Sequence, residues 1–292
     1  WLGGDNDTLI TSDYRPTQLE FAFLRKMRGS TPGYYLDVNP TLKKPYNYQL
    51  FKYLFDDEIK INSKEIKSKK GITSAVAIKA SKSGSVALFA PHKRGDSGVE
   101  GLAIEIIKQL TTKNDHSLKV ASETYLQLLK EYFSKLFGAD YLIVNCIEWG
   151  FLYHHGDFPQ GVREIIEDAV RQGNIKLIIC TNTLAEGVNL PIKIIVIHYT
   201  RRFNPEIKNW EDIKLRDLKN LVGRAGRAGK ETKGLVIVPH DRDFNQIRRL
   251  INNTNIEPVK GRLFNIISQI TEALKRHRLQ LSNEILDALS DN

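Results

Sequence analysis

The sequence predicts an α/β fold in which a largely parallel β-sheet is covered by helices on both faces. Short apolar runs rich in β-branched residues recur from residue 72 onward, and segments with the periodicity of amphipathic helices separate them. Apolar residues make up 41% of the 292 residues, which is typical of a globular chain with one generous core or two smaller ones. Strands that alternate with helices pair in parallel and are buried on both faces.

The first 70 residues are expected to lie outside this alternating region. Residues 1–33 predict a linker and a crossover strand, because Pro16 fixes the entry to an apolar run and glycines punctuate its exit. Residues 34–70 are rich in Tyr and Lys, which predicts an insertion with a solvated basic face. A nucleic-acid contact is the alternative for this insertion, since aromatic rings stack on bases and lysines bind phosphates.

The region 71–240 is predicted to be the α/β domain, and 241–292 a C-terminal helical extension. Strands are expected at residues 86–90, 151–153, 177–180, 194–197 and 235–238. Helices are expected at residues 99–110, 122–137, 160–172, 213–222, 244–251 and 264–277. The apolar run 141–149 fits a buried strand or a buried helix equally well by periodicity.

A polar loop follows the predicted strand 177–180, within the block LIICTNTLAEGVNLP at residues 177–191. Thr181, Asn182 and Thr183 place hydroxyls and an amide directly after the strand. Open α/β sheets bind ligands at the carboxyl ends of their strands, so this loop is a candidate ligand site. A helix N-cap is the alternative role for Thr183.

An arginine-rich turn ends a second block, DLKNLVGRAGRAG at residues 217–229. Arg224 and Arg227 alternate with glycines, so two guanidinium groups lie where small neighbours let a phosphate approach closely. The glycines follow a predicted helix rather than a strand, which argues against a dinucleotide-binding turn. Ion pairs with surface carboxylates such as Glu231 are the alternative for both arginines.

The two blocks resemble motifs V and VI of superfamily-two helicases, and TLAEGVNLP followed by GRAGR resembles the Ski-like branch in particular. Three further stretches occur in the family's order. Residues 1–21, WLGGDNDTLITSDYRPTQLEF, are similar to the crossover between two motor domains. Residues 85–94, SVALFAPHKR, are similar to motif IV. Residues 150–167, GFLYHHGDFPQGVREIIE, are similar to the HHAGL segment. The resemblance spans most of the chain. It implies a RecA-like helicase C-terminal domain at 71–240 and a helix at 141–149.

The resemblance implies ATP as the cofactor, with Mg²⁺ held by a first motor domain. Arg227 would be the finger that stabilises negative charge on the transferred phosphoryl group, and Arg224 would make a supporting phosphate contact. Within motif V, the residues that would face the nucleotide are Glu186, Gly187 and Asn189. Asn220 stands where the family usually has Gln, which leaves its contacts open.

The resemblance also implies a track for nucleic acid. Thr183 would donate to the phosphate backbone, and His155 and Gly156 would make backbone contacts with the strand. Phosphates would also meet the basic loop after the motif IV strand, which holds His92, Lys93 and Arg94. Such contacts carry no base information, which suits movement along any sequence. The alternatives are a purely exposed basic loop at 92–94 and a core role for His154.

The signatures of a first motor domain are missing from the sequence. No G-x-x-x-x-G-K followed by Ser or Thr occurs, and the nearest lookalike, at 229–231, lacks the hydroxyl that would bind magnesium. The acidic run 56–58 has no phosphate-binding loop before it and predicts a solvated turn. The chain begins at Trp1 within a family segment. We therefore expect a second motor domain whose partner is the N-terminal RecA-like domain of the same, longer protein.

Charge and cysteine content add weaker expectations. The net charge of +9 favours an acidic partner, of which nucleic acid is the commonest. No apolar run approaches the roughly 20 residues of a membrane span, so no membrane partner is expected. Cys146 and Cys180 lack C-x-x-C or His spacing, which predicts neither a metal site nor a disulfide and favours a reducing cytoplasm.

The predicted function is that of the second motor domain of an ATP-dependent nucleic-acid helicase or translocase. The family pattern implies movement from 3′ to 5′, and the chain alone is expected neither to bind ATP tightly nor to hydrolyse it. Two alternatives stay open. One is a double-strand translocase or restriction-type motor, which shares motifs V and VI, and the other is a non-catalytic nucleic-acid-binding clamp.

Overall fold

The computed structural model describes residues 18–26, 34–38, 68–181, 190–204, 208–223, 225 and 233–252. The chain divides into two compact units, residues 1–252 and 253–292, and all described residues lie in the first. No helix among them is both long enough and apolar enough to cross a membrane.

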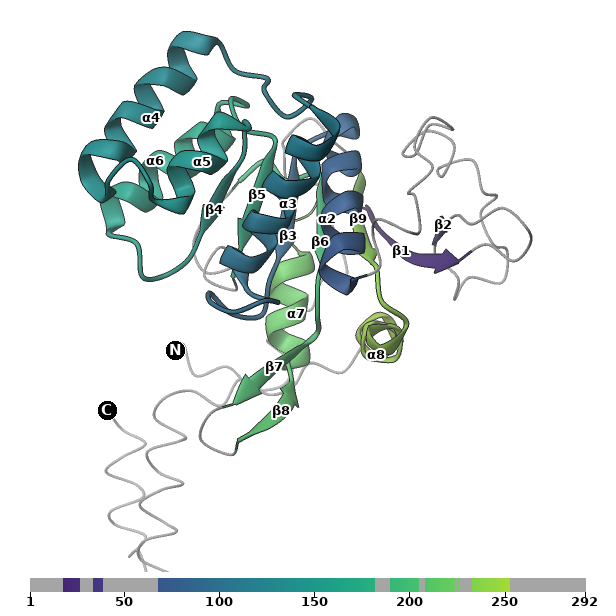
Figure 1. The fold of residues 1–292 in the computed structure, drawn as a ribbon. Helices are drawn as coiled ribbons and strands as arrows, with labels where there is room; N and C mark the ends of the chain where they lie inside the picture. Colours follow the sequence, from purple (N-terminus) through teal and green to yellow (C-terminus); the bar gives the residue numbers. More distant parts are fainter. Residues whose placement is uncertain are drawn as a thin grey trace, which may run out of the picture. The chain divides into compact units, whose positions relative to one another are not determined.

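A seven-stranded sheet forms the centre of this unit, in the order β2-β1-β9-β6-β3-β5-β4 (Figure 1). All neighbouring strands pair in parallel except β2, which is antiparallel to β1. Val86 opens β3 opposite Leu177 of β5 on one side and Ile194 of β6 on the other. The strands are β1 (Gln18–Lys26), β2 (Tyr34–Val38), β3 (Val86–Phe89), β4 (Leu152–His154), β5 (Leu177–Cys180), β6 (Ile194–Ile197) and β9 (Lys233–Val238).

Strands β3, β4, β5 and β6 are buried along their whole length, which explains their continuous apolar sequences. Helices α2, α3 and α5 pack beside one another on this sheet, and α4 packs on α5. The right-handed crossover rule places α6 and α7 on the opposite face. The helices are α2 (Lys69–Ala80), α3 (Val99–Lys113), α4 (Glu123–Phe137), α5 (Leu142–Glu148), α6 (Gln160–Arg171), α7 (Leu215–Val222) and α8 (Phe244–Asn252).

Most elements expected from the sequence are confirmed, often to within a residue. The strand at 177–180 and the strand at 194–197 have the expected bounds. Helix α3 runs three residues past its expected end and stops at Asn114, which adopts the left-handed conformation with φ 48°. The ambiguous run 141–149 forms helix α5, as the family resemblance implied. The helix expected at 264–277 lies outside the described residues.

Three elements were not expected from the sequence. Strand β2 and the first residues of α2 fall within 34–70, the range interpreted as an insertion, and β2 extends the sheet beside β1. Helix α2 begins at the N-cap Ser68, whose hydroxyl accepts a hydrogen bond from the Gly71 amide at 3.0 Å. Residues 73–80 of this helix are all buried, so it lacks the exposed polar face that gives an amphipathic signal. The third element is a hairpin.

The hairpin consists of β7 (Arg201–Asn204) and β8 (Asn209–Asp212) and lies between β6 and α7 in the chain. Arg201 pairs with Asp212 at 3.1 Å and Arg202 with Glu211 at 2.7 Å, so opposite charges face each other across the ribbon. Trp210 is 43% exposed. The ribbon projects beyond the edge of the large sheet (Figure 1). Its strands are short and polar, so the sequence has no alternation of apolar and polar residues that would predict them.

Helix α8 belongs to the first unit, although it begins the region interpreted as a C-terminal extension. The ring of Phe244 stacks on Phe23 of β1 with centroids 4.3 Å apart. The guanidinium group of Arg25 lies over the ring of Phe244, 4.7 Å from its centroid. Strand β1 and helix α8 therefore stabilise each other from opposite ends of the described chain.

Candidate functional site at the carboxyl edge of the sheet

Three loops follow the neighbouring strands β3, β5 and β4 at the carboxyl edge of the sheet. The loop after β3 holds His92, Lys93 and Arg94, and the loop after β4 holds His155 and Gly156. Thr181, the first residue after β5, donates its amide to the His154 carbonyl at 3.3 Å. Parallel strands bring these loops together, so the nucleic-acid residues predicted in motif IV and in the HHAGL-like segment share one edge.

The loop after β3 folds back tightly on the first turn of α3. The amides of Val99 and Glu100 donate to the carbonyls of His92 and Lys93 at 3.0 and 3.1 Å. A Cβ placed on Gly98 would lie 2.3 Å from the Arg94 carbonyl oxygen, so only glycine fits there. The loop backbone is therefore held by the helix, while the side chain of Arg94 is exposed and that of Lys93 is 21% exposed.

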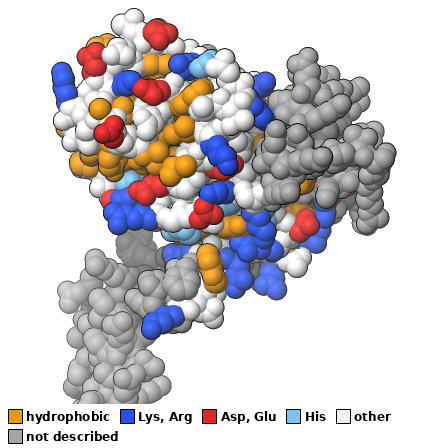
Figure 2. Space-filling model, in the orientation of Figure 1, with side chains coloured by type: hydrophobic (Ala, Val, Ile, Leu, Met, Phe, Trp, Pro, Cys, Tyr) orange, Lys and Arg blue, Asp and Glu red, His pale blue; other side chains and the backbone are white. Residues whose placement is uncertain are grey.

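Charge at this edge is positive but partly compensated. The Lys93 ammonium contacts a carboxylate oxygen of Asp157 at 2.7 Å, which joins the loop after β3 to the loop after β4. The hydrogen bond and charge of Lys93 lower the pKa of Asp157. Arg94 and Gly156 are exposed. Figure 2 shows Lys and Arg side chains gathered along the lower side of the molecule, the side from which the hairpin projects in Figure 1.

The paired histidines after β4 are buried and neutral. His154 and His155 are 1% and 2% exposed. Burial, together with the positive charge of Arg163, lowers the pKa of His154 to about 4. The neutral ring therefore contacts a carboxylate oxygen of Glu167 through its Nε2 at 3.2 Å as a hydrogen bond rather than an ion pair. His154 is thus a core residue, which was the alternative considered for it from the sequence.

His155 stacks on Phe158 with ring centroids 4.1 Å apart, and neither of its ring nitrogens has a hydrogen-bond partner among the described residues. Burial, with a smaller contribution from the charge of Lys93, lowers the pKa of His155 to about 4. A buried neutral ring cannot bind phosphate by charge. Any contact of this segment with nucleic acid must therefore come from its backbone or from the exposed Gly156.

The buried histidines predict a loss of stability in mild acid. His154 and His155 have folded pKa values of about 4 against 6.5 when unfolded, so below pH 6.5 the unfolded chain binds more protons than the folded one. Stability should fall as the pH drops from 6.5 to 4, by up to about 3 kcal/mol for each histidine. His155→Phe keeps the ring stack. It should reduce the slope of the unfolding free energy against pH by the amount that corresponds to about one bound proton. The check is the unfolding free energy against pH, with exposed His116→Gln as the control; equal slopes in the two variants would contradict the prediction.

The predicted nucleotide-facing residues lie outside the described residues. This applies to Glu186, Gly187, Asn189, Arg224 and Arg227, and also to Thr183, which was predicted to contact nucleic acid. Ala225, between the two arginines, is described: it is 2% exposed and forms a parallel bridge with Ile192. A Cβ on Gly234 would lie 2.6 Å from the Ala225 carbonyl carbon. The centre of motif VI thus packs closely against the beginning of β9 and the chain that follows motif V.

A buried polar cluster at the ends of β6 and β9 was not predicted from the sequence. The Thr73 hydroxyl lies 3.0 Å from His198 Nδ1 and 2.9 Å from His240 Nε2. Burial lowers the pKa of His198 well below its ordinary value and that of His240 to about 3. Both rings are therefore neutral, and the hydroxyl can donate to one ring and accept from the other. The only signal in the sequence was a histidine one residue after one apolar strand and two residues after the other.

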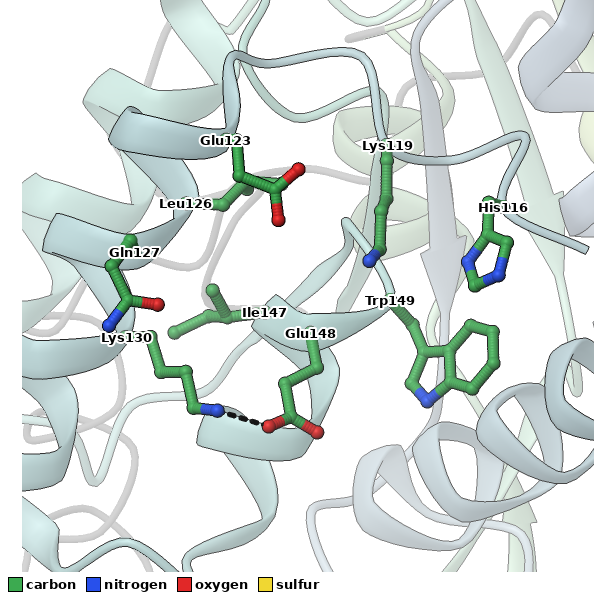
Figure 3. Close-up of a pocket in the computed structure, with 9 residues that line it drawn as sticks. All are labelled: His116, Lys119, Glu123, Leu126, Gln127, Lys130, Ile147, Glu148 and Trp149. Carbon is green, nitrogen blue, oxygen red and sulfur yellow. Dashed lines mark hydrogen bonds and ion pairs between the residues drawn. The ribbon is translucent and has the colours of Figure 1, made fainter.

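A pocket of about 330 Å³ lies away from this edge, between the α3–α4 connection, α4 and α5 (Figure 3). Trp149 and His116 stack on one side with centroids 5.1 Å apart, and Lys130 pairs with Glu148 on another. Its lining includes none of the residues predicted for ATP or nucleic acid. Among the described residues, no group of three or more His, Cys, Asp or Glu side chains could hold a metal ion. Cys146 and Cys180 are free and buried.

Comparison with known proteins identifies the family. Residues 102–229 match the family described as "Helicase conserved C-terminal domain". The chain is 31% identical over 181 residues to the DExH-box ATP-dependent RNA helicase DExH14 of Arabidopsis thaliana, covering 60% of this chain and 8% of that protein. It is 27% identical over 266 residues to the Hachiman protein HamB of Bacillus cereus, covering 84% of this chain and 22% of HamB.

A third relative is the ATP-dependent DNA helicase Hel308 of Pyrobaculum calidifontis, 32% identical over 112 residues, or 38% of this chain and 15% of that protein. The chain thus spans less than a quarter of the length of each of these three relatives. The matched region includes strands β4, β5 and β6 of the mostly parallel sheet, together with motif V and motif VI. This chain therefore contains a helicase C-terminal domain of the superfamily-two, DEAD/DEAH type, built on a RecA-like sheet.

Proposed function

We propose that this chain supplies the arginine finger and part of the single-strand track of an ATP-dependent helicase. ATP and its Mg²⁺ would be bound mainly by an N-terminal RecA-like domain of the same protein, and Arg227, supported by Arg224, would complete the site from this side. The observation that carries the proposal is the convergence of the loops after β3, β5 and β4, with Lys93 and Arg94 at one edge.

On the nucleotide side, the proposal rests on the anchoring of motif VI. Ala225, which lies between the two arginines in the sequence, is buried against Ile192 and Gly234 and anchors the chain at that residue. Glu186, Gly187 and Asn189 of motif V would lie next to the same nucleotide. A finger stabilises the transition state only when it is preorganised, and a packed backbone provides that.

On the nucleic-acid side, Lys93 and Arg94 would bind phosphates together with Thr183 and with the backbone of His155 and Gly156. These groups read no base identity, which suits a motor. His92 would contribute as a neutral side chain, since burial lowers its pKa. The proposed partner is single-stranded nucleic acid. The relatives include an RNA helicase and a DNA helicase, and the choice of polymer would be decided by direct binding.

Asp157 provides a test of this surface. Asp157→Asn removes the carboxylate that neutralises Lys93, so the chain should bind a single-stranded oligonucleotide about threefold more tightly at low salt. Lys93→Ala should weaken binding and make the dependence of log Kd on log salt shallower by about one. Fluorescence anisotropy over a salt series measures both. Asp140→Asn changes an exposed carboxylate elsewhere and serves as the control; an equal gain in that variant would show a net-charge effect only.

The hairpin β7–β8 favours strand separation over translocation alone. It projects from the same edge, and Trp210 of β8 is 43% exposed, on the strand that pairs with Arg201 and Arg202 of β7. Aromatic side chains stack on unpaired bases whatever their sequence. We propose that Trp210 holds the first unpaired base where the duplex opens.

Trp210→Ala should reduce duplex unwinding by the full-length protein about tenfold, since stacking of one base contributes about 1–3 kcal/mol. ATP turnover stimulated by single strands should remain within about twofold, because the hairpin lies outside the proposed ATP contacts. Strand-displacement and ATPase assays give the two numbers. Trp210→Phe should retain most unwinding, and Tyr132→Ala, at an exposed aromatic residue on α4, is the control. Unchanged unwinding in Trp210→Ala would exclude the stacking role.

A further inference from the structure

The base of the hairpin is held by side chains from the segment that follows β9. Thr200 directly precedes β7 and Ile213 directly follows β8, and the Ile213 amide donates to the Thr200 carbonyl at 2.8 Å. The amide and hydroxyl of Thr200 both donate to one carboxylate oxygen of Asp243, at 2.9 and 2.5 Å. The side-chain amide of Gln246 donates to the Ile213 carbonyl at 2.7 Å. Each leg of the hairpin thus has its own anchor.

Both anchors are shielded from water. Thr200 and Asp243 are each 1% exposed, and Gln246 is 9% exposed. Burial raises the pKa of Asp243, while its hydrogen bonds from Thr200 act in the opposite direction. Buried polar groups are costly unless they are hydrogen-bonded, so these donors and acceptors strongly favour one geometry. The surrounding helical turn η4 (Asp241–Asp243) and helix α8 set that geometry relative to the sheet.

A second layer fixes the anchors themselves. Thr73 of α2 joins His198, which directly follows β6, and His240, which lies two residues after β9. The ring of Tyr199 lies against both histidines, with centroids 4.0 and 5.3 Å away, and Arg242 covers Tyr199 at 3.9 Å. The strand end that leads into the hairpin and the strand end that leads into Asp243 are therefore held together.

We propose that Asp243 and Gln246 are positioning residues that fix the hairpin on the motor domain, so that domain movement during ATP hydrolysis is delivered to the duplex as strand separation. This rests on the proposed helicase function. An isolated two-stranded ribbon is marginally stable in water, so the hairpin needs a rigid base to resist load. Asp243 and Gln246 act through Thr200 and Ile213, and they take no part in the proposed contacts with ATP or nucleic acid.

The test compares Asp243→Ala with Asp243→Asn in the full-length protein. The Asn amide oxygen can still accept both bonds from Thr200, whereas Ala leaves both donors without an acceptor. The number of base pairs opened per ATP should fall about tenfold in Asp243→Ala, with ATP turnover within about twofold of wild type. Asp243→Asn should retain most of the wild-type number of base pairs opened per ATP. Thr200→Val removes one of the two donors to Asp243, so its number of base pairs per ATP should lie between those of Asp243→Ala and Asp243→Asn.

Hydrogen exchange of the hairpin amides gives a second readout that does not depend on activity. Exchange at 201–212 should become faster in Asp243→Ala and in Gln246→Leu, while exchange in α3 stays unchanged. Unchanged hairpin exchange, or unwinding and ATP turnover that fall together, would overturn the positioning role. Absence of nucleic-acid-stimulated turnover in the wild type would instead refute the proposed function, and the exchange result would still decide whether these residues anchor the hairpin.

Discussion

Replacing Arg227 with alanine is expected to reduce ATP turnover by the full-length protein about 10³- to 10⁵-fold. Negative charge develops on the transferred phosphoryl oxygens, and a guanidinium from the opposite motor domain stabilises it, which corresponds to about 4–7 kcal/mol of barrier. Arg227→Lys should rescue little, because an ammonium cannot present the planar fork of an arginine. Steady-state ATPase assays at saturating single-stranded nucleic acid measure the effect.

Arg171→Ala is the matched control for this change. Arg171 is an exposed arginine of α6 that pairs with Asp168 one turn earlier, so its loss should leave turnover within about twofold. Nucleotide binding by Arg227→Ala should weaken far less than turnover, because the finger acts mainly in the transition state. Turnover above about a tenth of wild type in Arg227→Ala would rule out the finger role.

Gly101→Ala should destabilise the domain by about 1–3 kcal/mol, although alanine normally stabilises a helix. A Cβ on Gly101 would lie 2.5 Å from the carbonyl oxygens of both Gly95 and Asp96. These oxygens are backbone atoms of the loop that carries Lys93 and Arg94, so the loop must move. We therefore expect weaker binding of single-stranded nucleic acid along with lower stability. Urea unfolding and anisotropy measure the two effects.

Gly161→Ala makes the same chemical change on α6, where a Cβ would meet no atom within 4 Å. It should be neutral or stabilising by about 0.5–1 kcal/mol, with unchanged binding. If the two variants were equally stable, the tight packing of the loop on α3 would not be a constraint. If Gly101→Ala lost stability but bound normally, the loop would not contribute to the track.

The sequence was sufficient to predict those elements whose formation depends mainly on one physical requirement. Fully buried parallel strands such as 177–180 and 194–197 need continuous β-branched apolar runs, so their bounds could be read directly. Capped amphipathic helices were also predictable: Ser122 caps α4 through its hydroxyl, 3.2 Å from the Tyr125 amide. The positions of Lys93, Arg94 and Gly156 at one edge followed from the parallel order of strands.

Elements that depend on distant partners could not be predicted. Strand β2 forms because β1 offers an edge, and the hairpin β7–β8 has polar strands held at the base by Asp243 and Gln246. The Thr73 cluster brings together residues 125 and 167 positions apart, which no local pattern can reveal. Neutral His155 illustrates the same limit, since its charge state depends on the burial that the fold creates.

The most direct test of the central claim is ATP hydrolysis by the full-length protein that carries this chain, with and without single-stranded DNA or RNA. A helicase motor predicts turnover that one of these polymers stimulates severalfold, and the stimulating polymer would be its track. Turnover that neither polymer changes, or no turnover at all, would contradict the account and leave a basic domain that binds nucleic acid without driving movement along it.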